Sequence, residues 1–442
     1  MSSHHDAHAL SRDEVLVGID RPTPRILSTI ALVLAVIGLI IFVVGLFVQP
    51  DRVWQALLVN WLYFTSISSA AVMFVAAQRI TTARWSRPIV RFLEGYVAFL
   101  PVAFVLLILM IFVGRHHIFW WANTPSEIPE KRIWLDPPFF LSRVTIVFTI
   151  IAGLSIWYIY TSVRLDVGIL PEAGASWARG LRERMRRGFR DERRELHSTH
   201  SQQGYMAVAL AFAFAFGWIL LSWDLSMSLD PHFQSTMYGW WFFMGAWVAA
   251  IASWTLIVMA WRRYLARYDL IQEKHFHDLG KLCFAFTAFW GYLTFGQYLV
   301  IWYGNMGEET HWMRLRLIGG WLVPTVTGVV LMFGFPFFGL LSRAAKVFLP
   351  TMFFFAASTV VGLWIHRYIE VYPSIYGQVA RMPFSIWEIG VTAGVLGIWG
   401  FCYLAFMDAF PRMRILLMTS PYRDEVQVPV DPRTMEPLPA HE

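Results

Sequence analysis

Ten apolar segments divide this chain, and each is longer than the roughly 20 residues that a helix needs to cross the hydrocarbon core of a bilayer. Within lipid, every backbone N–H and C=O group must be paired inside its own helix or inside a closed barrel. The strict alternation of a barrel strand is missing from this sequence, so we expect helices. Charged residues make up only 15% of the chain, compared with about 25% in soluble domains. We therefore predict an all-α integral membrane protein with ten transmembrane helices, at 26–48, 53–78, 89–113, 139–163, 205–227, 237–261, 279–303, 317–341, 347–369 and 385–410.

The distribution of basic residues predicts the orientation. When the N-terminus is placed in the cytoplasm, about three quarters of the 36 lysines and arginines lie on the cytoplasmic side, as the positive-inside rule requires. An even number of spans then places both termini in the cytoplasm, and the polar start of the chain predicts no cleavable signal peptide. The predicted parts are a cytoplasmic N-terminal segment at 1–25, spans one to four at 26–163, a basic cytoplasmic loop at 164–204, spans five to ten at 205–410 and a cytoplasmic tail at 411–442.

The long basic loop contains a possible amphipathic helix. Trp177, Leu181, Met185 and Phe189 recur every four residues, which would place them in one stripe on a helix. Arginines fill most of the positions between them, so we expect a helix that lies on the inner surface of the membrane. A solvated basic linker is the alternative.

A short internal repeat relates the two halves of the chain. Polar residues open span three, around Glu94, and span seven, around Asp278, while Arg143 and Arg316 lie near the outer starts of spans four and eight. The related spans are four apart, so they share an orientation. This predicts two four-helix bundles, spans 2–5 and 6–9, flanked by spans 1 and 10. Because only a few residues support the repeat, chance similarity is the alternative.

The sequence offers no ligand set for a resident cofactor. Among the histidines, only His366 lies plainly within an apolar span, so the paired ligands of a b-type haem are missing. Cys283 and Cys402 are too far apart in sequence to suggest an iron–sulfur cluster, a metal site or a disulfide framework. A phosphate-binding glycine loop is also missing. We therefore expect no cofactor and no metal in this chain, and no nucleic-acid partner.

Ionisable residues within the spans or at their edges are the candidate functional groups, because charges in a membrane are costly. The spacing of His366 and Glu370 predicts that they pair on one helix face. Asp224 ends a long apolar helix and could pair with Arg143 or Arg316 if either approaches it. These groups could conduct protons; structural pairs or groups in the headgroup layer are the alternatives. The proton-path candidates are Glu94, His277 and Asp278 on the inner side, and Asp224, Arg143, Arg316, His366, Glu370 and Glu388 on the outer side.

Three motifs resemble a known family. The sequence SWDLSMSLDPHF at 222–233, with Tyr238-Gly239 after it, is similar to a motif in the NrfD/PsrC-like membrane subunits of alternative complex III. FWGYLTFGQY at 289–298 and WYGN at 302–305 extend the similarity, which covers essentially the whole chain. Within the family, the chain is most similar to ActF-like subunits, the smaller of two related membrane subunits.

The resemblance implies a role in a quinol:cytochrome c oxidoreductase of the bacterial cytoplasmic (inner) membrane. The subunit would carry no cofactor, while partner subunits would carry haem c and iron–sulfur clusters, and the complex would oxidise a menaquinol-type substrate. The implied partners are an ActC-like membrane subunit, an iron–sulfur subunit, multihaem and monohaem cytochrome c subunits, small membrane subunits and lipid. Proton conduction is one implied role; direct quinol binding and a purely structural scaffold are the alternatives.

Overall fold

Helices make up all the regular structure in the part of the chain that is described. The computed structural model describes residues 11–17, 21–123, 129–170, 172 and 174–426. Ten of its helices are long and apolar enough to cross a membrane, as predicted. They are α2 (Arg25–Val48), α3 (Pro50–Ile80), α4 to α6 (Val90–Ile118), α8 (Pro137–Ile169), α10 (Glu192–Leu225), α11 (Tyr238–Leu265), α12 (Glu273–Gly304), α14 to α15 (Gly319–Gly339), α17 (Leu349–Tyr376) and α18 (Ile386–Ala409).

Helix α3 is the centre of the molecule. Its most apolar 18-residue window is completely buried, whereas only 17% of the equivalent window of α2 is buried. It contacts α10, α18, α11, α17, α5 and α8, so it has neighbours on all sides. Small residues such as Ser66, Ser69 and Ala70 let these helices approach closely, since packing in membranes depends on small side chains. The apolar surface of α2, in contrast, faces outward, as expected for contact with lipid.

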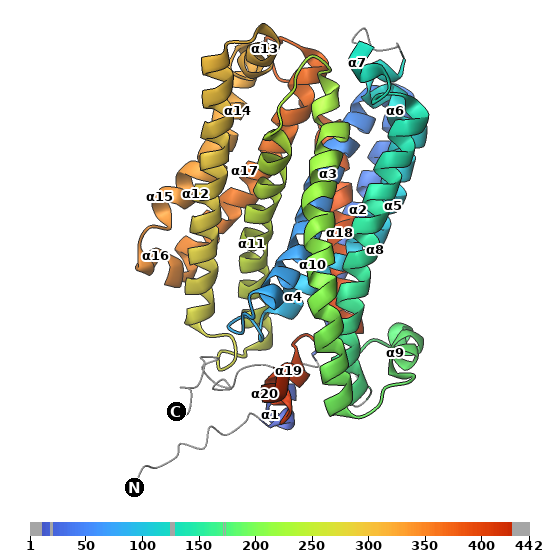
Figure 1. The fold of residues 1–442 in the computed structure, drawn as a ribbon, viewed down its shortest axis with the longest axis vertical. Helices are drawn as coiled ribbons and strands as arrows, with labels where there is room; N and C mark the ends of the chain where they lie inside the picture. The colour runs from blue at the N-terminus through green and yellow to red at the C-terminus, as the bar shows by residue number, and fades with distance from the viewer. Residues whose placement is uncertain (1–10, 18–20, 124–128, 171, 173, 427–442) are drawn as a thin grey trace.

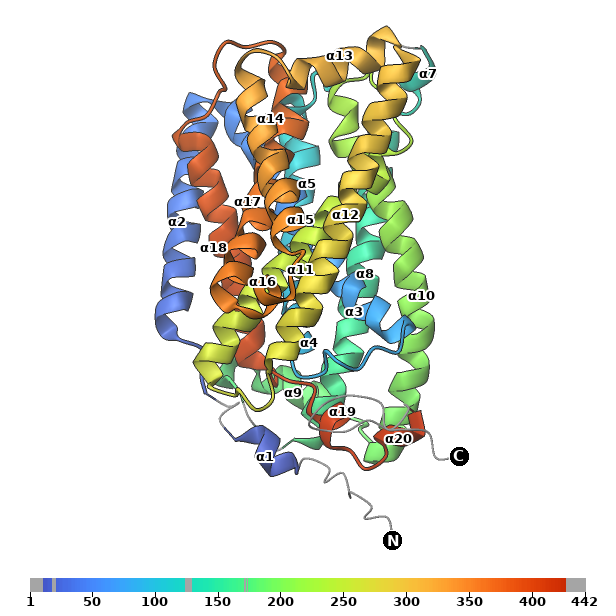
Figure 2. The same ribbon diagram turned by 90° about the vertical axis from the view of Figure 1, so that its left-hand side faces the viewer.

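Helices α2 and α18 pack against each other along one edge of the molecule (Figure 2). They approach closely at Gly38 and Gly394, where a Cβ atom on Gly38 would overlap the Cα atom of Gly394. Only glycine fits at such a contact. The first and last spans can therefore pack backbone against backbone, because glycine has no side chain to separate them.

Short helices cover the two ends of the spans (Figure 1). One end carries α1 (Arg12–Leu16), α9 (Arg179–Arg186), α19 (Ile415–Thr419) and α20 (Arg423–Val426). The other carries α7 (Pro129–Arg132) and α13 (Gly307–Arg316). The first and last described helices lie at the same end, which agrees with an even number of spans. The terms inner and outer below follow the predicted orientation.

The basic loop differs from the sequence prediction. It is shorter than 164–204, because α8 continues to Ile169 and α10 begins at Glu192, where Asp191 accepts hydrogen bonds from the first turn. Helix α9 ends at Arg186, before Gly188 adopts a positive φ of 71°. The predicted stripe of Trp177, Leu181, Met185 and Phe189 therefore does not lie on one helix: Trp177 and Leu181 are exposed, Met185 is buried, and the Phe189 ring lies against Gly168 of α8.

We predict that Gly38→Leu lowers the thermal stability of the purified protein by about 1–3 kcal/mol or more, because the new side chain must separate α2 from α18. Gly153→Leu on α8 is the matched control, since no atom lies within 4 Å of a Cβ at that position. The measurement is the unfolding midpoint in detergent. Equal midpoints for the two variants would contradict the close contact.

Candidate functional site

Asp224 lies at the outer end of α10 and is completely buried. Its carboxylate accepts hydrogen bonds from Arg143 Nε at 2.8 Å and Arg143 Nη2 at 2.7 Å, and a third from Trp134 Nε1 at 2.9 Å. The Arg143 guanidinium also stacks on the Trp134 ring, 3.8 Å from its centroid, and donates to the Trp134 carbonyl. Arg143 thus approaches Asp224, as the sequence left open, and the pair joins α8 to α10.

Arg316 repeats this arrangement in the second half of the chain. Its guanidinium stacks on the Trp312 ring at 3.6 Å and donates to the Trp312 carbonyl at 2.9 Å. Its other Nη donates to the Glu370 carbonyl and to the Ser374 hydroxyl, both on α17. Burial lowers the pKa of Arg316 to about 10, so it is still charged at neutral pH. Arg316 thus joins α13 to α17 through Glu370 and Ser374, and it makes no described contact with Asp224.

His366 and Glu370 pair on α17, as their spacing predicted. His366 Nδ1 lies 2.8 Å from Glu370 Oε1. The same carboxylate accepts hydrogen bonds from Arg367 Nη1 at 2.6 and 2.7 Å. Arg367 also donates to the Phe242 carbonyl of α11 at 2.7 Å. All three ionisable residues are buried, so this is a compact charged cluster within the outer half of the spans.

An apolar cavity of about 390 Å³ adjoins this cluster. It lies among α11, α12, α13, α14 and α17, and both His366 and Glu370 line it. The His366 ring makes edge contacts with Trp241 and Trp290, at centroid distances of 4.7 and 5.4 Å. Gln297 adds a further polar group. A mostly apolar cavity with a few polar side chains is the usual form of a small-molecule site.

Glu388 lies at the start of α18 and is also buried. It caps its own helix through Ser385, accepts hydrogen bonds from Arg52 of α3 at 2.8 and 3.0 Å, and accepts one from the Tyr372 hydroxyl at 3.0 Å. These contacts join α3, α17 and α18 at the outer end. A capping role explains the position of Glu388 without any proton transfer.

Glu94 belongs to a buried charged network on the inner side. Its carboxylate pairs with Arg91 at 2.5 Å and with Arg414, and it accepts the Ser162 hydroxyl at 2.8 Å. Arg91 also pairs with Asp166 of α8. Two carboxylates and two guanidinium groups therefore compensate each other in this network.

Sequence reasoning missed Asp166 and Arg414. Asp166 lies beyond the predicted end of span four, and it became part of the site because α8 continues further. Its other oxygen accepts the Leu416 N–H of the tail at 2.8 Å. Burial alone would lower the pKa of the Arg414 guanidinium, but the nearby Glu94 carboxylate outweighs burial and raises it, so Arg414 stays charged. Since Arg414 comes from the tail, no local pattern could have paired it with Glu94.

His277 and Asp278 are not joined to the Glu94 network. Asp278 pairs with Lys281 on its own helix at 2.7 Å, and both side chains are partly exposed. Among the described residues, no hydrogen bond or ion pair connects His277 or Asp278 to Glu94. The two parts of the predicted inner group are thus separate in the structure.

Helix α3 carries buried polar side chains between the inner and outer clusters. Asn60 donates to the Thr392 hydroxyl of α18 at 2.9 Å, and the Tyr63 hydroxyl donates to a carbonyl of α17. The hydroxyls of Thr65 and Ser69 are buried and have no hydrogen-bond partner among the described residues. Such groups are costly in an apolar interior unless water reaches them.

The described residues were compared with the requirements of a metal site, and the chain was compared with known proteins. Within the described ranges, no group of three or more His, Cys, Asp or Glu side chains could hold a metal ion. No protein-family model matches the chain, and no curated protein is similar to it. The functional reading therefore depends on the sequence motifs and on the contacts described above.

We predict that Asp224→Asn destabilises the protein by about 3 kcal/mol, because it leaves the buried Arg143 guanidinium without a full counter-charge. Thermal unfolding in detergent measures the effect. Asp136→Asn is the control, since Asp136 is exposed at the start of α8. The double variant Arg143→Leu/Asp224→Leu should lose less stability than the single one, because it removes both charges. A single variant as stable as the control would refute a structural role for this pair.

Proposed function

We propose that this chain is a membrane subunit, without a redox cofactor of its own, of a quinol-oxidising respiratory complex of the alternative complex III type. The support is the resemblance at residues 222–233, and contacts made by that motif. Ser226 and Tyr238 share a hydrogen bond of 2.6 Å, and the Ser228 hydroxyl donates to the Asp224 carbonyl at 2.5 Å. The motif residues thus hold the outer turn between α10 and α11. The expected partners are the ActC-like, iron–sulfur and cytochrome c subunits.

We also propose the two-bundle arrangement that the family implies. In support, α3 and α8 each contact α5 and α10 in the first half, and α17 contacts α11, α12 and α14 to α15 in the second. The arginines that open spans four and eight further relate the halves, since Arg143 and Arg316 each stack on a tryptophan and contact the following span. This repeated contact is a stronger argument for a repeat than the sequence similarity alone.

The function that the geometry favours for this subunit is proton conduction together with assembly. The observation that carries it is the polar side of α3: a helix with no lipid-facing surface in its core carries hydroxyl and amide groups between two charged clusters. Hydroxyls that lack partners among the described residues, such as those of Thr65 and Ser69, are suited to hold water molecules. Water and hydroxyl groups together can pass protons between the Glu94 network and the cluster of His366 and Glu370.

The candidate residues divide into two groups on this proposal. Glu370 and His366 face a cavity, so they are the better outer proton carriers. Asp224 is held by three donated hydrogen bonds from Arg143 and Trp134, which favours a structural role. Glu94 is similarly fixed by Arg91 and Arg414. Protonation of Glu94 would require one of these pairs to open, which would provide a barrier to leakage.

We predict that Thr65→Val lowers the number of protons translocated per electron in reconstituted vesicles of the assembled complex. The substitution keeps the shape of the side chain and removes a hydroxyl that makes no hydrogen bond within the described part of the chain, so a purely structural role predicts no effect. Thr255→Val is the matched control, because that hydroxyl is bonded within α11 to the Ile251 carbonyl. Proton release and electron transfer are measured on the same vesicles. An unaltered ratio in the Thr65 variant would count against conduction along α3.

A second function, quinol binding, is favoured by the cavity beside His366. Its walls are mostly apolar, as an isoprenoid quinol requires, and His366 could accept a hydrogen bond from a hydroxyl of the quinol ring. Because His366 Nδ1 lies 2.8 Å from the Glu370 carboxylate, we take the other ring nitrogen as the one that faces a ligand.

Gln297→Leu separates the two functions. If the cavity binds quinol, the loss of this polar group should raise the KM for quinol about tenfold or less, corresponding to one hydrogen bond. Steady-state quinol oxidation by the assembled complex measures this change, with Tyr303→Phe as a control on the exposed part of the same helix. An unchanged KM would remove the argument for a quinol in this cavity and leave the conduction proposal intact.

A further inference from the structure

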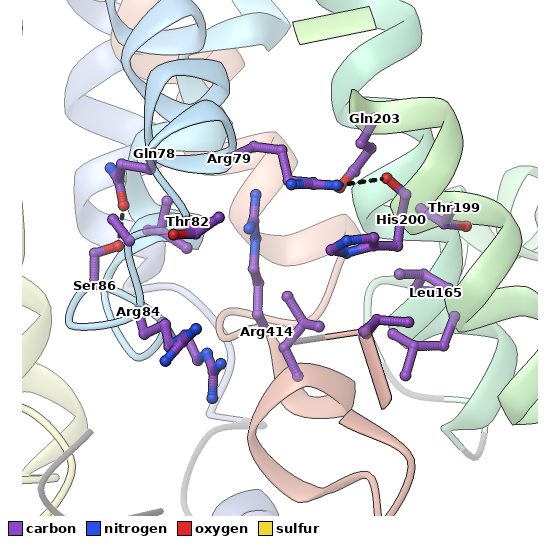
Figure 3. A pocket seen from close by; sticks show the side chains of 16 residues that line it. Gln78, Arg79, Thr82, Arg84, Ser86, Leu165, Thr199, His200, Gln203 and Arg414 are labelled. Atoms are coloured by element: carbon purple, nitrogen blue, oxygen red, sulfur yellow. Dashed lines mark hydrogen bonds between the residues drawn. The ribbon is translucent and has the colours of Figure 1, made fainter. Parts of the chain in front are cut away.

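A second cavity, of about 200 Å³, opens between α3 and α10 near their inner ends. Figure 3 shows its surroundings: Arg79 from α3, Arg84 from the following turn and Arg414 from the tail lie around it, with His200 of α10 on the opposite side. Arg87 also lines it. None of the described residues that line this cavity is an aspartate or a glutamate. It is therefore a strongly cationic recess.

The positive charge of this recess is only partly compensated. Arg414 is compensated within the network of Glu94, Arg91 and Asp166, so the uncompensated charge belongs to Arg79 and Arg84. Arg79 donates to the His200 carbonyl at 2.9 Å, a neutral acceptor, and its Nε is buried without a hydrogen bond. The Nε of Arg84 is likewise buried and unbonded within the described part of the chain. Buried donors of this kind favour an anionic acceptor, because unmade charged hydrogen bonds are costly.

The shape and level of the cavity indicate what kind of anion it would take. It lies where α3, a candidate membrane span, reaches its inner end, and we expect lipid headgroups near the ends of the spans. Its remaining walls include the apolar side chains of Leu165, Leu196 and Leu417. Guanidinium groups bind phosphate through paired N–H donors, while apolar walls suit the carbons attached to that phosphate.

We infer that this cavity binds the phosphate group of an anionic ligand, either the headgroup of an anionic phospholipid or free phosphate. The donors are Arg79 and Arg84, with Arg414 beside them. A zwitterionic headgroup would fit less well, because its quaternary ammonium group would be repelled by the arginines. The inference is independent of the proposed respiratory function.

Native mass spectrometry of the full-length protein in detergent tests this inference. Phosphatidylglycerol and phosphatidylcholine are added in equal amounts, and the lipid retained by each protein molecule is counted. We expect preferential retention of phosphatidylglycerol. Arg84→Gln should weaken that retention about tenfold, the equivalent of one charged hydrogen bond. Arg84 makes no described contact that the substitution would break. Arg187→Gln is the matched control, since Arg187 is exposed at the same end of the molecule.

Added inorganic phosphate distinguishes the two sources. If phosphate does not displace phosphatidylglycerol, the ligand is a lipid headgroup; if it displaces the lipid in the unmodified protein but has less effect on Arg84→Gln, the site accepts free phosphate. Either result supports the inference. Equal retention of the two lipids, or equal retention by the Arg84 and Arg187 variants, would overturn it. Phosphatidylglycerol binding that arises only when the chain is truncated after Val426 would also overturn it for the intact protein.

Discussion

A charge buried within a membrane protein needs an opposite charge or hydrogen-bond partners, and where those partners lie on another helix they join the spans. Three of the buried pairs connect different helices: Arg143 connects α8 to Asp224 of α10, Arg52 connects α3 to Glu388 of α18, and Arg91 connects α4 to Asp166 of α8. Lipid offers no strong drive for apolar helices to associate, because its tails are as apolar as leucine. Packing of small residues and these charged contacts therefore carry much of the specificity of the fold.

The spans could be predicted from the sequence because the bilayer sets both their length and their composition. Their ends could not. Helix α10 begins at Glu192, well before the predicted residue 205, because polar residues continue a helix into water as readily as apolar ones continue it into lipid. The prediction of one helical stripe in the basic loop was wrong for a related reason. A four-residue period from Trp177 to Phe189 is typical of one helix, but the backbone turns at Gly188 and Phe189 packs against Gly168 of α8.

The candidate site could be predicted only where its residues are close in sequence. His366 and Glu370 are one helical turn apart, so their contact follows from helix geometry. Arg143 and Asp224 are on different helices, and the sequence could identify each as costly to bury without showing that they meet. His277 and Asp278 show the opposite case, since sequence reasoning grouped them with Glu94 and the structure keeps them apart. Which charges pair is a property of the three-dimensional arrangement.

The contact of Arg414 with Glu94 has a consequence for biosynthesis. A ribosome makes the chain from its N-terminus, so spans three and four exist long before residue 414 is synthesised. Until then, Glu94 and Asp166 share a single guanidinium, that of Arg91. The inner ends of these early spans stay incompletely neutralised, and water must remain near them, until the tail docks. Closure of the inner face is thus a late event in maturation, and it reports that all ten spans have been inserted.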